Sequence, residues 1–199
     1  MEKIINLIRT IARAGVWCSG SVMLIIAILI TAEVISRKAF SYHIIAADEL
    51  AGYALAITTS WSISFTLLER GHIRVDALYM ILPNKLKAIL DIIGLFALSV
   101  FPLSLTWYAY HMLTNSWELG KVSNTAMAMP LWIPQGIWFI GLIFFALTTV
   151  VLLLRVLVLF AAGDVEQVNR LAGTRSVSSE LHDEIDEITV NKQQSYSGR

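Results

Sequence analysis

The chain contains four apolar stretches long enough to cross a membrane, separated by short polar segments. They cover residues 16–36, 50–68, 87–113 and 131–160. About 20 apolar residues in an α-helix span the roughly 30 Å hydrocarbon core of a bilayer. The pattern predicts an all-α integral membrane protein with four transmembrane helices, in a membrane domain of residues 16–163. The last two stretches exceed a perpendicular crossing, so we expect their helices to tilt, bend or project.

Two further segments have the pattern of short amphipathic surface helices. In residues 1–15, apolar side chains fall on one face, and basic and polar ones fall on the other. This is typical of a helix on an anionic leaflet, and a plain extension of the first membrane helix is the alternative. After the second stretch, Val75, Leu78, Tyr79 and Leu82 repeat at helical spacing. A second surface helix is therefore expected there.

The most informative polar segment, which we call the elbow, is residues 69–76, directly after the second apolar stretch. It combines a glycine with five ionisable groups, a density of charge that hydrocarbon excludes. The chain must therefore leave the membrane at the elbow, and its charges point to anchoring among headgroups or to a partner protein. The glycine and ionisable residues are Glu69, Arg70, Gly71, His72, Arg74 and Asp76.

Composition supports the membrane class and excludes several functions. Hydrophobic residues make up 56% of the chain and charged residues 15%, which is typical of an integral membrane protein. Fifteen Lys and Arg balance fifteen Asp and Glu, so net charge does not indicate a nucleic-acid partner. Cys18 is the single cysteine; it cannot form an intrachain disulfide or by itself a structural zinc site.

The basic residues predict the orientation of the chain. Twelve of the fifteen Lys and Arg fall in the N-terminal segment, in the connection after the second stretch and from Arg155 onwards. Under the positive-inside rule, both termini lie in the cytoplasm. Residues 164–199 are polar and acidic, and we expect them to form a solvated, largely disordered cytoplasmic tail.

The second apolar stretch carries most of the polar chemistry at membrane depth. Asp48 and Glu49 open it and suit the positive end of a helix; an ion or proton site is the sharper alternative. Trp61 lies well inside, where its indole N–H needs an acceptor. We expect this helix to pack against protein, its hydroxyls bonding across helices or back to carbonyls one turn earlier. The hydroxyl residues are Thr58, Thr59, Ser60, Ser62, Ser64 and Thr66.

The sequence predicts no catalytic, cofactor or metal site. It has no glycine-rich phosphate loop, nucleophile elbow or cluster of metal ligands. A four-helix haem protein needs axial histidines on facing helices, whereas only His111 falls within a predicted span.

Several motifs together resemble the small membrane subunit, of DctQ type, of tripartite ATP-independent periplasmic (TRAP) transporters. The resemblance covers about residues 16–160, and the elbow is its most specific part. Many members have an aromatic residue and an acid before the glutamate of the second helix, and Ala46-Ala47-Asp48 supplies only the acid here. The matching segments are Glu33 with Arg37-Lys38-Ala39-Phe40, Asp48-Glu49-Leu50, Arg70 to Asp76, and Ser123 to Gly136.

The resemblance implies a role in the bacterial inner membrane. Such subunits bind a large twelve-helix permease that holds the sodium and substrate sites, while a periplasmic binding protein delivers an organic acid. The chain would then be a noncatalytic scaffold, embedded in membrane lipid, with no cofactor and no nucleic-acid partner. The residues expected at the subunit interface are Glu49, Trp61, Arg70, Gly71, His72, Arg74 and Asp76.

Two other functions remain open on the sequence. One is an autonomous exporter working as a dimer of four-helix units, with Glu49 or Glu33 carrying protons; efflux by the purified chain alone would identify it. The other is a membrane anchor for an electron-transfer complex, which an absorbance spectrum with a haem band would support.

Overall fold

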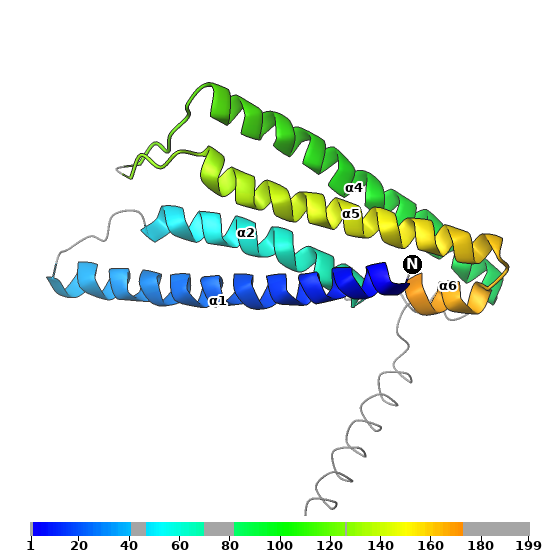
Figure 1. The fold of residues 1–199 in the computed structure, drawn as a ribbon. Helices are drawn as coiled ribbons and strands as arrows, with labels where there is room; N and C mark the ends of the chain where they lie inside the picture. Colours follow the sequence, from blue (N-terminus) through cyan, green and yellow to red (C-terminus); the bar gives the residue numbers. More distant parts are fainter. Residues whose placement is uncertain (1, 41–46, 70–81, 126, 173–199) are drawn as a thin grey trace, which may run out of the picture.

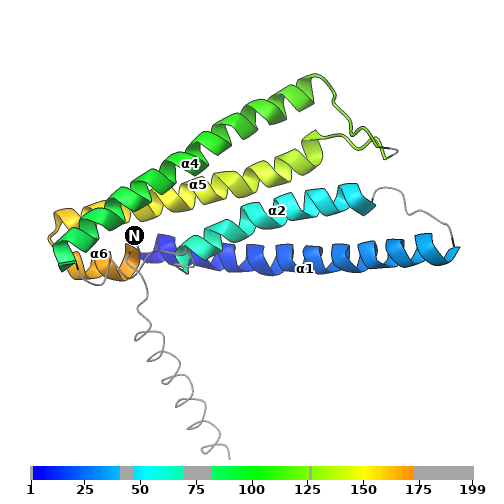
Figure 2. The same ribbon diagram turned by 180° about the vertical axis from the view of Figure 1, so that it is seen from behind.

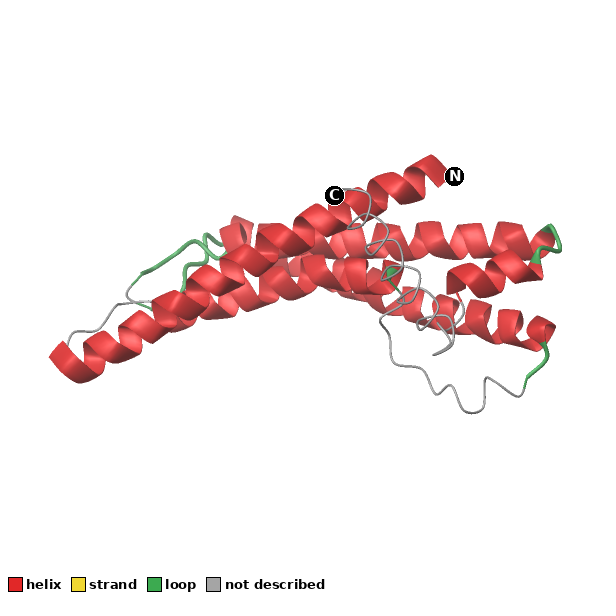
Figure 3. Cartoon of the chain, turned by 90° about the horizontal axis from the view of Figure 1, so that it is seen from below, coloured by secondary structure: helices red, strands yellow, loops and turns green. Residues whose placement is uncertain are grey.

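The computed structural model describes residues 2–40, 47–69, 82–125 and 127–172 (Figure 1). The described chain is helical, without strands, and a single isolated β-bridge joins Val122 to Pro130 (Figure 3). The helices are α1 (Glu2–Phe40), α2 (Ala47–Leu68), α4 (Asn84–Glu118), α5 (Trp132–Ala161) and α6 (Val165–Ala172).

The four long helices form two antiparallel hairpins, α1 with α2 and α4 with α5 (Figures 1 and 2). Helix α5 also packs against α2, which joins the hairpins, and the short α6 packs against α4 and α5. We call the end that holds the N-terminus and α6 the N-terminal end. The opposite end, where α2 begins and α4 connects to α5, is the loop end (Figure 1).

Within the described residues, helices α1, α4 and α5 are long and apolar enough to cross a membrane, so three of the four predicted spans are confirmed as membrane-span candidates. The predicted second span does form a helix, α2, over nearly the predicted residues. Its hydroxyl side chains lower the hydropathy of its apolar stretch, and α2 is not among the membrane-span candidates. The membrane crossing of α2 stays a prediction.

Helix α1 is one unbroken helix of 39 residues, so residues 2–15 continue directly into the predicted first span. Ile5, Ile8 and Ala12 on its apolar face are buried within the protein. The segment is thus a helical extension, the alternative to a separate surface helix. The other predicted surface helix, around Val75 to Leu82, lies mostly outside the described residues.

The core lies between α4, α5, α6 and the end of α2. Its buried members are Leu67, Ala88, Leu95, Phe145, Leu152, Val156 and Val168. Helix α6 differs from the prediction of a disordered tail over 164–199, because Val168 is fully buried while Val165 and Leu171 pack against the core. Residues 173–199 of the predicted tail lie outside the described residues.

Candidate functional site

Trp61 lies in a seam between three helices of its own chain. Its ring stacks on Phe144 of α5, with centroids 6.0 Å apart and planes inclined by 23°. On the α1 side, a Cβ added to Gly15 would lie only 2.9 Å from Cε3 of Trp61. The indole therefore occupies space that the missing side chain of Gly15 leaves open. The prediction that α2 packs against protein at Trp61 is confirmed.

Helices α2 and α5 approach most closely at Ser60 and Gly141. A Cβ added to Gly141 would lie 3.0 Å from both the Cβ of Ser60 and the Cδ1 of Trp61, and inside contact distance of the Ser60 Oγ. Small residues at a helix contact let the two backbones approach closely. The van der Waals contacts made there stabilise the pair in lipid, where no hydrophobic effect drives helices together. Gly141 thus sets the spacing of the two hairpins.

Three of the six serine and threonine hydroxyls of α2 bond within their own helix, whereas the buried Ser64 hydroxyl has no partner in the described residues. The hydroxyls of Thr59, Ser60 and Thr66 donate to carbonyls three or four residues earlier, at 2.9–3.1 Å. Thr58 instead donates across to the carbonyl of Ser19 in α1, at 3.2 Å. Both predicted patterns occur, and bonding within the helix is the more frequent among the described hydroxyls.

At the loop end, Glu49 holds the α4–α5 loop against the first turn of α2. The Tyr53 hydroxyl donates to its Oε1 at 2.5 Å, and the Thr125 hydroxyl donates to its Oε2. The hydroxyls of Ser123 and Thr125 lie 3.1 Å apart. Hydrogen bonds from Ser123, Thr125 and Tyr53, in that order, lower the pKa of Glu49, against a smaller effect of burial. These donors keep Glu49 charged.

The loop that Glu49 holds has an ordered backbone. The Ser123 N–H donates to the carbonyl of Met129 at 2.8 Å, and the Leu131 N–H donates to that of Lys121 at 3.0 Å. Ala128 takes a positive φ of 46°, which is uncommon for a residue with a Cβ. The sequence suggested helix capping or an ion site for Glu49. The contacts show a carboxylate that fixes a loop, and no group of three or more His, Cys, Asp or Glu is clustered in the described residues.

The remaining charges gather near helix ends. Glu33 and Arg37, four residues apart on α1, form an ion pair at 3.8 Å, with Glu33 buried. At the N-terminal end, Arg9 meets Glu69, the first residue of the elbow, at 3.9 Å, and Asp91 on α4 is only 2% exposed. The other predicted interface residues lie outside the described residues, and they are Arg70, Gly71, His72, Arg74 and Asp76.

Two long apolar faces remain uncovered by the bundle. On α1, Trp17, Leu24, Ile28 and Ile35 are 59–75% exposed, and they lie opposite the face that packs on α2. Ile89, Ile93, Phe96, Val100 and Trp107 form a similar face on α4. Apolar surface on this scale suits lipid or a partner protein rather than water.

Comparison with known proteins matches the chain to a protein family. The family model described as the DctQ component of tripartite ATP-independent periplasmic transporters matches residues 26–159, more than half of the chain. A search of curated proteins finds no match. The matched residues include the last 15 residues of α1, all of α2, α4 and the elbow, and nearly all of α5. The chain therefore belongs to the DctQ family and is a small permease component of a TRAP transporter.

Proposed function

We propose that this chain is a noncatalytic scaffold that binds and stabilises the large permease subunit of its transporter. The assembly lies in the bacterial inner membrane and takes up an organic acid by sodium-driven transport, with a periplasmic binding protein delivering the cargo. The observation that carries the proposal is the outward face of α1. The described bundle leaves this face uncovered along a helix of 39 residues.

The outward face of α1 has the composition of a helix–helix contact. Its positions 17, 21, 24, 28, 31 and 35 alternate in steps of four and three, the spacing of a seam between packed helices. Ser21 and Thr31 lie among the large side chains, and both hydroxyls donate to carbonyls four residues earlier at 2.8 Å. Because these hydroxyls are already satisfied, the small residues can lie against a partner helix without an unpaired donor.

The outward face of α4 supports a different role. It consists of large apolar side chains along the length of the helix, as expected for a surface that faces lipid. We therefore assign α1 to the partner and α4 to the bilayer. The elbow, with Arg70, Gly71, His72, Arg74 and Asp76, extends the proposed interface on the cytoplasmic side. Its first residue, Glu69, already pairs with Arg9 of α1.

Glu49 and Trp61 serve this interface through the chain's own structure. Trp61 sets the packing of α2 on α1 and α5, so it aligns the face that the partner meets. Glu49 fixes the α4–α5 loop at the opposite end. We propose that both residues stabilise the rigid bundle on which the large subunit is held.

Copurification of the full chain with its large subunit tests the proposal. Replacing Ser21→Trp and Thr31→Trp together should reduce recovery of the large subunit about tenfold, which corresponds to about 1.4 kcal/mol of binding energy. The matched control is Ala97→Trp with Ser104→Trp on α4, where both positions are exposed; it should copurify normally. A second variant, Arg74→Ala with Asp76→Ala, tests the elbow.

The outcome that would contradict the proposal is full assembly and uptake in both the α1 and the elbow variants. Transport of a solute against its gradient by the chain alone, in vesicles without the large subunit, would equally refute a noncatalytic scaffold. Membrane expression of each variant, compared with the α4 control, separates loss of binding from loss of folding.

A further inference from the structure

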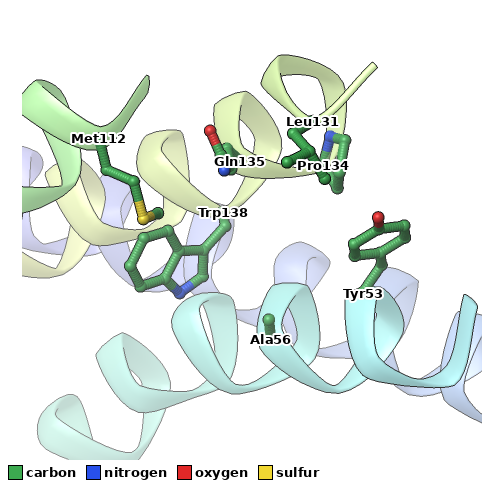
Figure 4. A pocket seen from close by; sticks show the side chains of 7 residues that line it. All are labelled: Tyr53, Ala56, Met112, Leu131, Pro134, Gln135 and Trp138. Carbon is green, nitrogen blue, oxygen red and sulfur yellow. The ribbon is translucent and has the colours of Figure 1, made fainter. Parts of the chain in front are cut away.

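A cavity of about 230 Å³ lies near the loop end between α2, α4 and α5. In Figure 4, Tyr53 and Ala56 of α2 lie across from the α5 side chains, and Met112 of α4 lies beside Trp138. The cavity is partly open rather than sealed. Its lining residues are Tyr53, Ala56, Met112, Leu131, Pro134, Gln135 and Trp138.

The walls of the cavity favour an apolar occupant. Four of the seven lining side chains carry no polar N–H or O–H group, and a fifth, Trp138, has only its indole N–H. The Tyr53 hydroxyl already donates to Glu49. A buried water molecule needs two to four polar partners, so an apolar space of this kind holds water poorly. A flexible thioether such as that of Met112 can adapt to the shape of a chain-like ligand.

One polar atom at the cavity has no partner. The Oε1 of Gln135 is buried, and no donor in the described residues reaches it. A buried carbonyl oxygen without a hydrogen bond is costly, so such an atom is usually satisfied by a water or a ligand. A ligand that fills the cavity and satisfies this atom would combine an apolar chain with at least one hydrogen-bond donor.

The position of the cavity relative to the lipid headgroups indicates the class of ligand. Trp117 and Trp132 pack edge to face at the loop end, 4.8 Å apart, as aromatic residues do at the level of headgroups. Trp138 lies six residues further along α5, about 9 Å deeper. The cavity thus begins near the headgroups and extends to the upper part of the acyl chains.

We propose that one phospholipid binds here, with an acyl chain filling the cavity and a donor group of its headgroup reaching Gln135. Phosphatidylethanolamine offers an ammonium and phosphatidylglycerol offers hydroxyls, and either fits the acceptor. Phosphatidylcholine has no such donor. This site requires only that the bundle lies in a bilayer, so it does not depend on the proposed scaffold role.

The lipid retained by the full chain, purified with its large subunit, tests the site by native mass spectrometry. Ala56→Phe fills the cavity and should remove one bound phospholipid. Leu55→Phe adds the same ring at the neighbouring exposed position of α2 and should retain it. Equal lipid retention in both variants would overturn the proposal.

Headgroup exchange tests the part assigned to Gln135. The complex should prefer phosphatidylethanolamine or phosphatidylglycerol over phosphatidylcholine by about fivefold, the value of one hydrogen bond. Gln135→Leu should abolish this preference while a lipid is still retained. Equal binding of all three lipids by the unmodified complex would refute the role of Gln135 as an acceptor.

A photo-reactive variant distinguishes lipid from protein and does not depend on filling the cavity. Trp138→p-benzoylphenylalanine places a reactive ketone at the cavity wall with a side chain of similar size. Irradiation of membranes that contain the complex should give an adduct with the mass of a phospholipid. A cross-link to the large subunit would show instead that a protein side chain occupies the cavity, and would overturn the proposal.

Discussion

The close crossing of α2 and α5 makes Gly141→Ala a sharp test of the fold. The added Cβ would lie 3.0 Å from the Cβ of Ser60 and from the Cδ1 of Trp61. Rotating Ser60 would move only its hydroxyl and would break its 2.9 Å hydrogen bond to the carbonyl of Ile57. The Cβ of Ser60 cannot rotate away, so the two helices must separate.

The expected cost follows from two opposing terms. Overpacking a well-packed contact typically costs about 1–3 kcal/mol. Replacing glycine by alanine within a helix returns about 0.5–1 kcal/mol through its higher helix propensity. The net effect of Gly141→Ala should be a loss of about 1–2 kcal/mol in the free energy of unfolding, measured by chemical or thermal unfolding in mild detergent.

Two further variants separate the steric effect of the added methyl group from the higher helix propensity of alanine. Gly94 on α4 has no atom within 4 Å of an added Cβ, so Gly94→Ala should leave stability unchanged or raise it. Ser60→Gly combined with Gly141→Ala moves the small residue to the other helix and should recover part of the loss. The cycle should therefore show a favourable coupling between positions 60 and 141.

The reasoning fails if Gly141→Ala is as stable as Gly94→Ala. It also fails if the two changes at the crossing are simply additive. Either result would mean that the backbones of α2 and α5 are further apart than the structure places them, and that Trp61 is not held between the hairpins.

Three more predictions concern separate contacts. Because hydrogen bonds lower the pKa of Glu49 in the folded chain, its stabilisation is fully present above the ordinary value of 4.5 and is lost as the pH falls through the lower folded value. The protection factors of the Ser123 and Ala128 amides, which are corrected for the intrinsic pH dependence of exchange, should therefore fall at acid pH, and Glu49→Gln should remove this dependence; identical profiles of the protection factors would contradict it. Thr58→Val deletes the bond to α1 and should cost about 0.6 kcal/mol in unfolding free energy, whereas a change above 2 kcal/mol would point to another role. Val168→Ala should cost about 2 kcal/mol by removing two buried methyl groups, and a neutral result would show that α6 is not part of the core.

The membrane helices could be predicted well because hydropathy reports burial in hydrocarbon. Predicted bounds of 50–68 and 131–160 agree closely with α2 and α5. Helix α1 begins 14 residues before the predicted 16–36 and ends four residues after it, and α4 ends five residues beyond the predicted 87–113. Hydropathy falls where a helix leaves the apolar region, but its backbone hydrogen bonds continue, so the apolar stretch marks only part of the helix.

Helix α6 was missed because its composition is polar. Its local signals are nonetheless present in the chain. Gly163 has a φ of +79°, as expected where one helix ends. The Oδ1 of Asp164 accepts the N–H of Gln167 at 3.0 Å, the hydrogen bond of a helix N-cap. A glycine followed by a capping residue and three apolar positions could have predicted a short helix here.

The role of Glu49 could not be read from its neighbours in sequence. Its position at the start of α2 indicated a charge that complements the helix dipole, which is a local effect. The residue that donates to its Oε2, Thr125, lies 76 positions away. Such a contact follows from how the two hairpins pack, and that in turn depends on a single glycine at the crossing of α2 and α5.

The distribution of polar groups connects this fold with the proposed role. A protein that moves an organic acid needs donors directed into a space that the cargo can enter. In the described chain, hydroxyls of α2 donate to carbonyls of the same helix or of α1, and the carboxylate of Glu49 receives a donor from the α4–α5 loop. What the bundle presents outward along α1 and α4 is mainly apolar surface. Polar groups that stabilise the interior, beneath an apolar exterior, are what a scaffold requires, because its function is to stay rigid while the subunit it holds changes shape.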